Sequence, residues 1–247
     1  MGAGAKTLLV CGIGGAALAV TAALIATKGG TDLFRAPDLS LVPQMAEAPV
    51  PLPDGRAIHV QKFEVTIAEW ARCHAAGACS LAVKPRPGFD PETTPATGLS
   101  YVDVGEYLAW INGETGLNFR LPTMAEWEAM AAPVLPEKPD PIFTDPSLSW
   151  ASSYLTENVP ARALKPSGSF AVTAEGVADL DGSVWEWTQD CYNDSDPSRC
   201  AAFYVGGEHV AAIPLLVRDP ARGGCAVGAP PAHLGMRLVS DDPVPTS

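Results

Sequence analysis

The protein has 247 residues, with 16 lysine and arginine residues against 28 aspartate and glutamate residues and a formal net charge of −12. This length allows one sizeable domain, or one domain with an appendage. A hydrophobic content of 47% with only 18% charged residues excludes a disordered chain. The negative charge argues against nucleic acid or an anionic membrane surface as a partner, because phosphate binding needs a basic face.

The N-terminal segment is an uncharged apolar run from Thr7 to Thr27. At about 1.5 Å per residue, a helix over this run is roughly 30 Å long, which matches the hydrocarbon thickness of a bilayer. The pattern predicts a transmembrane signal-anchor over residues 1–28 and a single-pass membrane protein whose globular domain is extracytoplasmic, either periplasmic or at the cell surface. The alternative is a signal peptide cleaved near Thr21–Ala23. We favour the anchor, because signal peptides usually have a shorter apolar core.

Residues 29–55 form a proline-rich segment that ends at the turn signal Asp54-Gly55. Proline-rich segments stay extended and act as semi-rigid spacers. The composition therefore predicts a tether over residues 29–55, a globular domain over residues 56–242 and a short tail over residues 243–247.

The six cysteines give no CxxC motif and no cysteine–histidine spacing typical of a structural zinc site. Two close pairs, Cys73 with Cys79 and Cys191 with Cys200, predict disulfides in an oxidising compartment. The alternative is a cytosolic protein with buried thiols, which the preceding membrane run makes the weaker interpretation. Cys225 is left over, and we expect it to be unpaired.

The globular part predicts a few short elements joined by long loops. Hydrophobic spacing and capping residues predict three helices, the first capped by Thr66 and ended by Gly77, the second opened by Ser100-x-x-Asp103 and the third by Thr123-x-x-Glu126. Alternation and short apolar runs predict strands over residues 57–63, 184–188, 202–206 and 234–239, with a short extended piece over residues 118–121. The fold class is therefore α+β with limited regular secondary structure.

Four motifs along this part carry a resemblance to a known family. Residues 63–66 (FEVT), 119–128 (FRLPTMAEWE) and 179–188 (DLDGSVWEWT) resemble the family sequences xEVTxxxW, RLPTEAEWE and DMxGNVWEWT. The fourth, closing motif has two parts, Gly206-Gly207 and residues 234–239 (LGMRLV), which resemble the family's GGS and GFRLV elements. The chain thus resembles the formylglycine-generating enzyme, or sulfatase-modifying factor, superfamily (the FGE-sulfatase domain), which implies a C-type-lectin-like fold.

The motif residues themselves are mainly structural. Trp127, Trp185 and Trp187 are large apolar anchors of the kind that a loop-rich core needs. We expect Arg120 and Arg237 to pair with carboxylates such as Glu126, Glu128 or Glu186, rather than to be solvated or satisfied by carbonyl groups.

The resemblance also implies where the catalytic chemistry would lie. The namesake enzyme binds copper through two cysteines shortly after the GGS element, and by count these positions fall on Ala211 and Leu216 here. Neither side chain is the thiolate that Cu(I) requires, so copper is not expected. Cys225 and His209 are the weak catalytic candidates that remain. The histidines form no HExxH or H-x-H cluster.

A structural calcium site is the one family site that the motifs still match. The resemblance assigns it to the side chains of Asp179 and Glu186 and to the carbonyl oxygens of Gly182 and Val184. Calcium takes six to eight oxygen ligands and often mixes carboxylates with turn carbonyls. The alternative is a turn in which Asp179 caps backbone amides and Glu186 pairs with an arginine.

Three functions are consistent with the sequence. The first is a membrane-anchored, non-catalytic accessory subunit of a cell-envelope protein complex, a pseudoenzyme of the superfamily, and we favour it because the copper ligands are missing. The second is a formylglycine-generating-type oxidase with rearranged thiols that modifies exported proteins. The third is a glycan- or peptide-binding lectin-like module. For the apolar stretch Ile213–Val217 we expect either a buried strand or an exposed protein-binding surface.

Overall fold

The computed structural model describes residues 36–135, 163–192, 199–207, 210–218 and 233–245. The described residues from Pro37 onward belong to one compact unit. The predicted anchor over residues 1–28 lies outside the described residues. Among the helices that are described, none has the length and apolar character needed to span a bilayer.

The described residues contain three α-helices, and each begins at the capping residue that the sequence predicts. They are α1 (Ile67–Ala75), α2 (Tyr101–Thr115) and α3 (Met124–Ala131), with N-caps Thr66, Ser100 and Thr123. In each box the cap side chain accepts a hydrogen bond from the third helical N–H, and the acidic side chain there accepts one from the N-cap N–H. Donors at the helix start that would otherwise lack partners are thereby satisfied.

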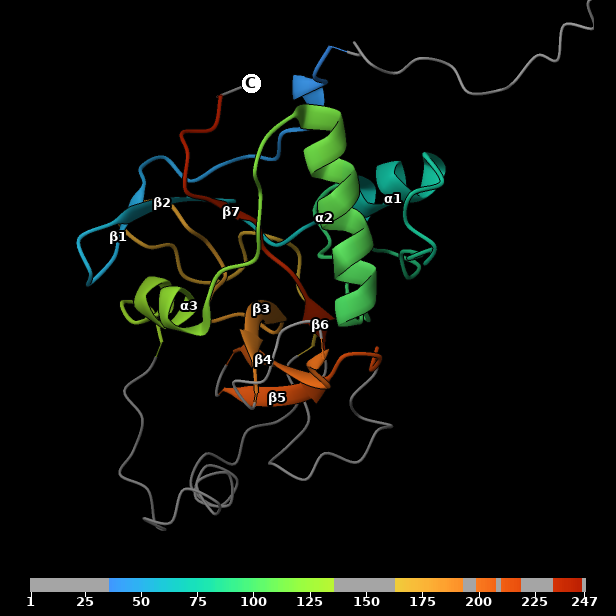
Figure 1. Ribbon diagram of the computed structural model, residues 1–247. Coiled ribbons are helices and arrows are strands. Elements are labelled where there is room, and N and C mark those ends of the chain that lie inside the picture. The colour runs from blue at the N-terminus through green and yellow to red at the C-terminus, as the bar shows by residue number, and fades with distance from the viewer. Residues whose placement is uncertain (1–35, 136–162, 193–198, 208–209, 219–232, 246–247) are drawn as a thin grey trace, which may run out of the picture. The chain divides into compact units, whose positions relative to one another are not determined.

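The strands form two small sheets (Figure 1). One has the order β1-β2-β7, with β1 at Val50–Pro51, β2 at Ala57–Val60 and β7 at Val239–Ser240. The other has the order β5-β4-β3-β6, with β3 at Trp185–Cys191, β4 at Ala202–Gly206, β5 at Ala211–Pro214 and β6 at Leu234–Gly235. The pair β3–β6 is parallel and the other pairs are antiparallel. The α+β class is as predicted.

The tether prediction is wrong for residues 37–55. This segment contains a 3-10 turn at Leu39–Leu41 and strand β1, and the side chains of Val42, Val50 and Leu52 are buried. Prolines are compatible with this packing because β1 is an edge strand, where Pro51 lacks only a donor that the ladder does not use. The apolar residues between the prolines therefore decide the structure of this segment.

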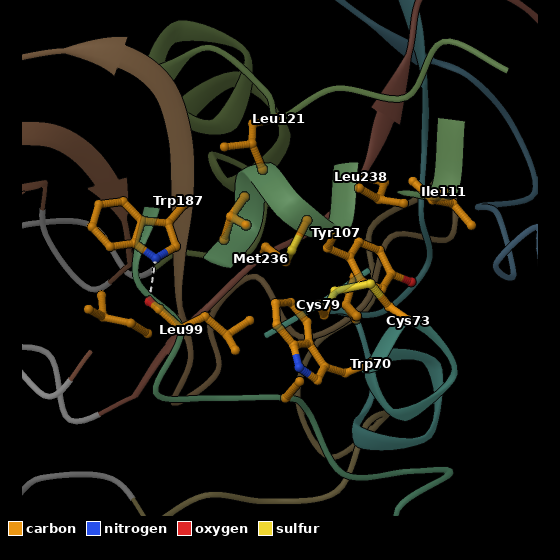
Figure 2. Packing of buried hydrophobic residues seen from close by; sticks show 14 of the residues in the cluster. Trp70, Cys73, Cys79, Leu99, Tyr107, Ile111, Leu121, Trp187, Met236 and Leu238 are labelled. Carbon is orange, nitrogen blue, oxygen red and sulfur yellow. Dashed lines mark hydrogen bonds between the residues drawn. A yellow bond between two sulfur atoms is a disulfide. The ribbon is translucent and has the colours of Figure 1, made fainter. Parts of the chain in front are cut away.

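The core divides into two clusters of buried side chains. In the larger one, the rings of Trp70 and Tyr107 stack at a centroid distance of 5.3 Å. Trp187 lies across the same cluster and donates from Nε1 to the carbonyl oxygen of Leu99 at 2.8 Å (Figure 2). The smaller cluster centres on Trp127, against strands β1 and β2. Aromatic rings thus supply much of the buried surface in a fold with short elements.

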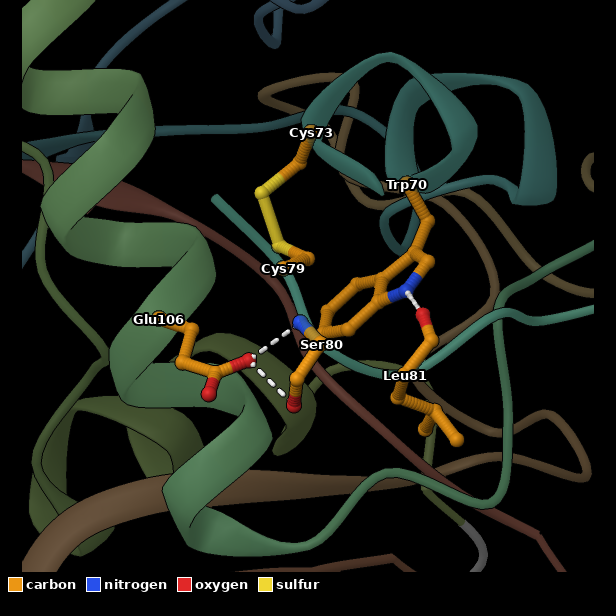
Figure 3. Close-up of a disulfide and its surroundings, with 6 residues drawn as sticks. All are labelled: Trp70, Cys73, Cys79, Ser80, Leu81 and Glu106. Atoms are coloured by element: carbon orange, nitrogen blue, oxygen red, sulfur yellow. Dashed lines mark hydrogen bonds between the residues drawn. A yellow bond between two sulfur atoms is a disulfide. The ribbon is translucent and has the colours of Figure 1, made fainter. Parts of the chain in front are cut away.

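Both predicted disulfides are confirmed. Cys73 in α1 is joined to Cys79 with a Cα–Cα distance of 5.3 Å, and Cys191 to Cys200 at 5.8 Å. Figure 3 shows that hydrogen bonds reinforce the first bridge, since Glu106 of α2 accepts from the backbone N and Oγ of Ser80 at 2.7 and 2.9 Å. The loop after α1 is therefore fixed to α2. Cys225 lies outside the described residues.

Candidate functional site

The motif glycines and tryptophans fit into one another. A Cβ atom at Gly206 would lie 2.2 Å from Cδ2 of Trp127, and one at Gly207 would lie 2.6 Å from Cδ2 of Trp185. Contacts below 3.0 Å essentially never occur at real Cβ atoms. The two glycines are therefore required because indole rings from two other motifs lie directly against their backbone.

Arg237 is fully buried and joins these motifs electrostatically. Its guanidinium donates from Nε to both oxygens of Glu186 at 3.1 Å and from Nη2 to Oε1 at 2.7 Å. Its Nη1 donates to the carbonyl oxygens of Gln61 and Lys62. Trp127 donates from Nε1 to Oε2 of Glu186 at 3.0 Å. The expected arginine–carboxylate pairing is confirmed here, and it holds a glutamate of the predicted calcium site.

The second predicted pair is also present. Arg120 binds Glu126 through Nη1–Oε2 at 2.7 Å and Nη2–Oε1 at 2.9 Å, and it also contacts Asp241. Burial acts to raise the pKa of Glu126, but the hydrogen bonds from Arg120 and from the Thr123 amide outweigh it, so this pKa lies below its ordinary value. This pair stabilises the start of α3.

The four predicted calcium ligands lie in one turn and its following strand. Asp179 has a left-handed backbone with φ of 66°, and its carboxylate accepts from the amides of Gly168 and Phe170. Glu186 is bound by Arg237 and Trp127, as described above. These contacts match the alternative interpretation, because all four carboxylate oxygens already accept hydrogen bonds from protein donors. No metal-binding group of three or more acidic, histidine or cysteine side chains occurs among the described residues. Calcium at Asp179, Gly182, Val184 and Glu186 stays a prediction.

The two positions that the resemblance assigns to the family's copper cysteines differ sharply from each other. Ala211 lies in β5, pairs with Val205 of β4 and is 5% exposed. Leu216 follows the strand and is 73% exposed. Both side chains are hydrocarbons and offer no ligand atom, so these two positions do not fit copper. The weak candidates His209 and Cys225 lie outside the described residues.

The stretch Ile213–Val217 is neither wholly buried nor wholly exposed. Ile213 is buried in the larger core cluster, whereas Leu216 points to solvent after a turn in which the amide of Val217 donates to the carbonyl oxygen of Pro214 at 3.0 Å. Ile213 thus belongs to a core strand, whereas Leu215 and Val217 are partly buried against the same cluster and Leu216 is strongly exposed. The buried strand is thus confirmed for Ile213, and protein binding at the exposed Leu216 stays a prediction.

The segment Leu215–Arg218 is held to the first turn of α2 by a backbone hydrogen bond and an ion pair. The amide of Tyr101 donates to the carbonyl oxygen of Leu215 at 3.1 Å. Arg218 binds Asp103 through Nε–Oδ2 at 2.7 Å and Nη2–Oδ1 at 2.6 Å. Burial would raise the pKa of Asp103, yet the hydrogen bonds from Arg218 and Ser100 together hold it below its ordinary value. Sequence reasoning identified Asp103 only as a capping residue and missed Arg218, because their separation in the chain leaves no local signal.

Exposed apolar side chains lie next to these contacts between α2 and the segment Leu215–Arg218. Val102, 44% exposed, occupies the same first turn of α2, next to the residue that contacts Leu215. We call Val102 and the segment Leu215–Arg218 the α2 surface. A cavity of about 250 Å³ lies beside it, because Gly98 lines that cavity and approaches the carbonyl oxygen of Arg218. Lys84 and Arg86 line the cavity as well.

The solved structures that resemble this chain have low sequence identity to it. PvdO from Pseudomonas aeruginosa superposes with a TM-score of 0.51 at 20% identity, covering 79% of this chain and 91% of PvdO. Treponema denticola variable protein 1 gives 0.49 at 16% identity, over 81% of this chain and 93% of that one. CarF gives 0.47 at 15% identity, over 74% and 86%. The likeness to PvdO supports the fold alone.

The family itself is settled by sequence. No curated protein matches the chain. Residues 15–242, however, match the family model described as "Sulfatase-modifying factor enzyme 1-like domain" (FGE-sulfatase). This match covers most of the chain and contains all four motifs, whose glycines, tryptophans and arginines make the contacts described above. The protein therefore belongs to the sulfatase-modifying factor enzyme 1-like family.

Proposed function

We propose that this protein is a non-catalytic member of its family, a membrane-anchored accessory subunit that binds another exported protein in the cell envelope. The observation that carries the proposal is the pair of hydrocarbon side chains, Ala211 and Leu216, at the positions of the copper cysteines. Without two thiolates, copper-dependent oxidation of a substrate cysteine has no ligands at this place. Of the two side chains, Ala211 is buried and Leu216 is exposed to solvent.

The α2 surface supports a binding role. Leu216 and Val102 are exposed, while the backbone beneath them is held by Tyr101 and by the Asp103–Arg218 pair. A rigid support lowers the entropic cost of binding, since little ordering is needed when the partner docks. Contiguous exposed apolar patches mark protein interfaces, and we propose that Leu216 and Val102 belong to one.

Two features support an extracytoplasmic location. The bridges Cys73–Cys79 and Cys191–Cys200 are typical of an oxidising compartment. The uncharged run from Thr7 to Thr27 has the length of a bilayer span. Intact-mass measurement of membrane-extracted protein tests the anchor, and a mature N-terminus beyond residue 20 would show that the segment is a cleaved signal peptide.

The catalytic part of the proposal is tested by an activity assay. The purified full-length protein is supplied with copper, oxygen and a cysteine-containing sulfatase peptide, and the aldehyde product is sought by mass spectrometry. We expect no aldehyde. Turnover that is abolished by Cys225→Ser would contradict the proposal and favour the oxidase with rearranged thiols.

The binding part is tested by comparing surface variants. We expect a partner protein that co-purifies with the detergent-solubilised wild type to be lost with Leu216→Glu. The matched control is Val172→Glu, since Val172 is also apolar and 53% exposed but belongs to a different loop. Equal recovery with both variants would exclude the α2 surface, and saturable binding to a glycan array would favour the lectin-like alternative.

A further inference from the structure

A second cavity, of about 270 Å³, is lined by residues that do not belong to the α2 surface. Its walls come from the segment after β2, from the start of α1 and from two loops that contribute Glu92 and Ser167. The loops are fixed in place, since the amide of Ser167 donates to the carbonyl oxygen of Thr93 at 2.7 Å. The cavity is therefore built from segments that are far apart in the sequence.

Two buried polar atoms on this cavity have no hydrogen-bond partner among the described residues. They are Oε2 of Glu64 and Oγ of Ser167, and both residues line the cavity. The Glu64 side chain is almost completely buried. Buried polar atoms in folded proteins are normally hydrogen-bonded, so each exception calls for an explanation. A ligand with hydrogen-bond donors in the cavity explains both at once.

The charges around Glu64 indicate what that ligand carries. Three carboxylates, those of Glu64, Asp179 and Glu186, act on the single guanidinium of Arg237. Glu186 takes the close hydrogen bonds, while Oε2 of Glu64 stays 3.7 Å from Nη2 of Arg237. The buried cluster thus has more carboxylates than cations, and a positive charge beside Glu64 would compensate it.

The charged side chains that line the cavity are also mainly negative. Glu64, Glu69 and Glu92 face one cation, Arg72. Phe63 adds an apolar wall suited to a short hydrocarbon chain. An ammonium group has three donors, which are enough for Glu64 and Ser167 together. The volume lies below the usual range for a drug-sized ligand, so the ligand is small.

We propose that this cavity binds a small primary amine in its ammonium form, with Glu64 and Ser167 as the acceptors. The proposal is independent of partner binding at the α2 surface. Binding is coupled to a proton. Burial first, and then Glu186 and Asp179, raise the pKa of Glu64 to about 8 against the opposite effect of Arg237. Burial also raises the pKa of Glu69, while Arg72 acts to lower it. A bound ammonium favours the ionised form of Glu64, so its proton is released to solvent.

The test is calorimetric titration of the full-length protein at pH 7 with n-butylamine hydrochloride, in two buffers of different ionisation enthalpy. We expect saturable binding with release of a proton. We also expect Glu64→Gln to weaken binding about tenfold or more and to abolish the release, and Ser167→Ala to weaken binding several-fold. Glu128→Gln is the matched control, because Glu128 lies on the exposed face of α3, and it should leave binding unchanged.

Several results would overturn the proposal. Two concern the amine itself: the absence of saturable binding, and equal affinity in Glu64→Gln and wild type. Two concern other ligands: equal binding of tetramethylammonium chloride, whose cation has no hydrogen-bond donors, and Glu64-dependent binding of calcium chloride that excludes the amine. If Glu64→Gln does not fold, Ser167→Ala and the proton release in the wild type decide the question. None of these results depends on Leu216, so the failure of this proposal and the failure of the proposed function are distinguishable.

Discussion

Gly206→Ala introduces a single methyl group where the structure has no room for one. The added Cβ would lie 2.2 Å from Cδ2 of Trp127, whereas ordinary van der Waals contact begins at 3.4 Å. The indole or the β4 backbone must therefore shift by more than 1 Å. Neither moves freely, because Trp127 is buried and Gly206 pairs with Glu186 in the sheet.

The expected loss of stability follows from two contributions. Overpacking of a close-packed core costs about 1–3 kcal/mol and occasionally more. A displaced indole also weakens the 3.0 Å hydrogen bond from Trp127 to the Glu186 carboxylate, and hydrogen bonds to charged groups contribute about 1.5–3 kcal/mol. We expect Gly206→Ala to lower the free energy of unfolding by about 3–6 kcal/mol, a large part of a typical total of 5–15 kcal/mol.

Urea unfolding followed by tryptophan fluorescence measures this change. The matched control is Gly113→Ala in α2, where the added Cβ meets no atom within 4 Å. In a helix this control should raise stability by about 0.5–1 kcal/mol, because alanine has the higher helix propensity. If Gly206→Ala unfolds within 1 kcal/mol of the wild type, the reasoning from close approach is refuted.

Three further predictions concern charge and cross-linking. The pKa of Glu64 is raised in the folded state from 4.5 to about 8. The stability contributed by its protonated side chain is therefore complete below pH 4.5 and is lost as the pH rises to 8. Over this range, the melting temperature of Glu64→Gln should fall less than that of the wild type. The pKa of Asp103 is lowered instead, so the contribution of its pair with Arg218 should be present above pH 3.8 and be lost at lower pH. Arg218→Met should reduce this acid sensitivity, leaving the part due to Ser100, and should speed amide exchange over residues 215–218. Replacing Cys73 and Cys79 together by serine should cost about 2 kcal/mol in thermal unfolding, because the bridge closes a short loop; an unchanged melting temperature would contradict this estimate.

Local signals in the sequence were sufficient for the helices and for the disulfides. A capping box involves residues three apart, so Thr66, Ser100 and Thr123 predict their helix starts without knowledge of the fold. The cysteine pairs are also close in the chain. The arginine–carboxylate pairs were predictable for another reason, since a buried arginine requires an acidic partner and the motifs contain few candidates.

The remaining features depend on contacts between distant segments. The Asp103–Arg218 pair and the cavity beside Glu64 and Ser167 join residues that no sequence pattern connects. The segment 37–55 was predicted as a tether because its prolines dominate the composition. Its buried valines and leucine gain their stability from strand β2 and the core, which composition cannot indicate.

The contacts of the family motifs also explain why a chain can keep the sequence motifs of its family without the residues needed for catalysis. Gly206, Trp127 and Arg237 act on one another within the core, so the signature residues specify the fold. Ala211 contributes to that fold through its backbone pairing in β5, which any side chain of suitable size permits. A cysteine there is needed for copper but not for the strand. A family match through the motifs thus implies the fold and does not by itself imply the activity. At positions 211 and 216, where the resemblance places the copper ligands, this chain has side chains without ligand atoms, and Leu216 is exposed.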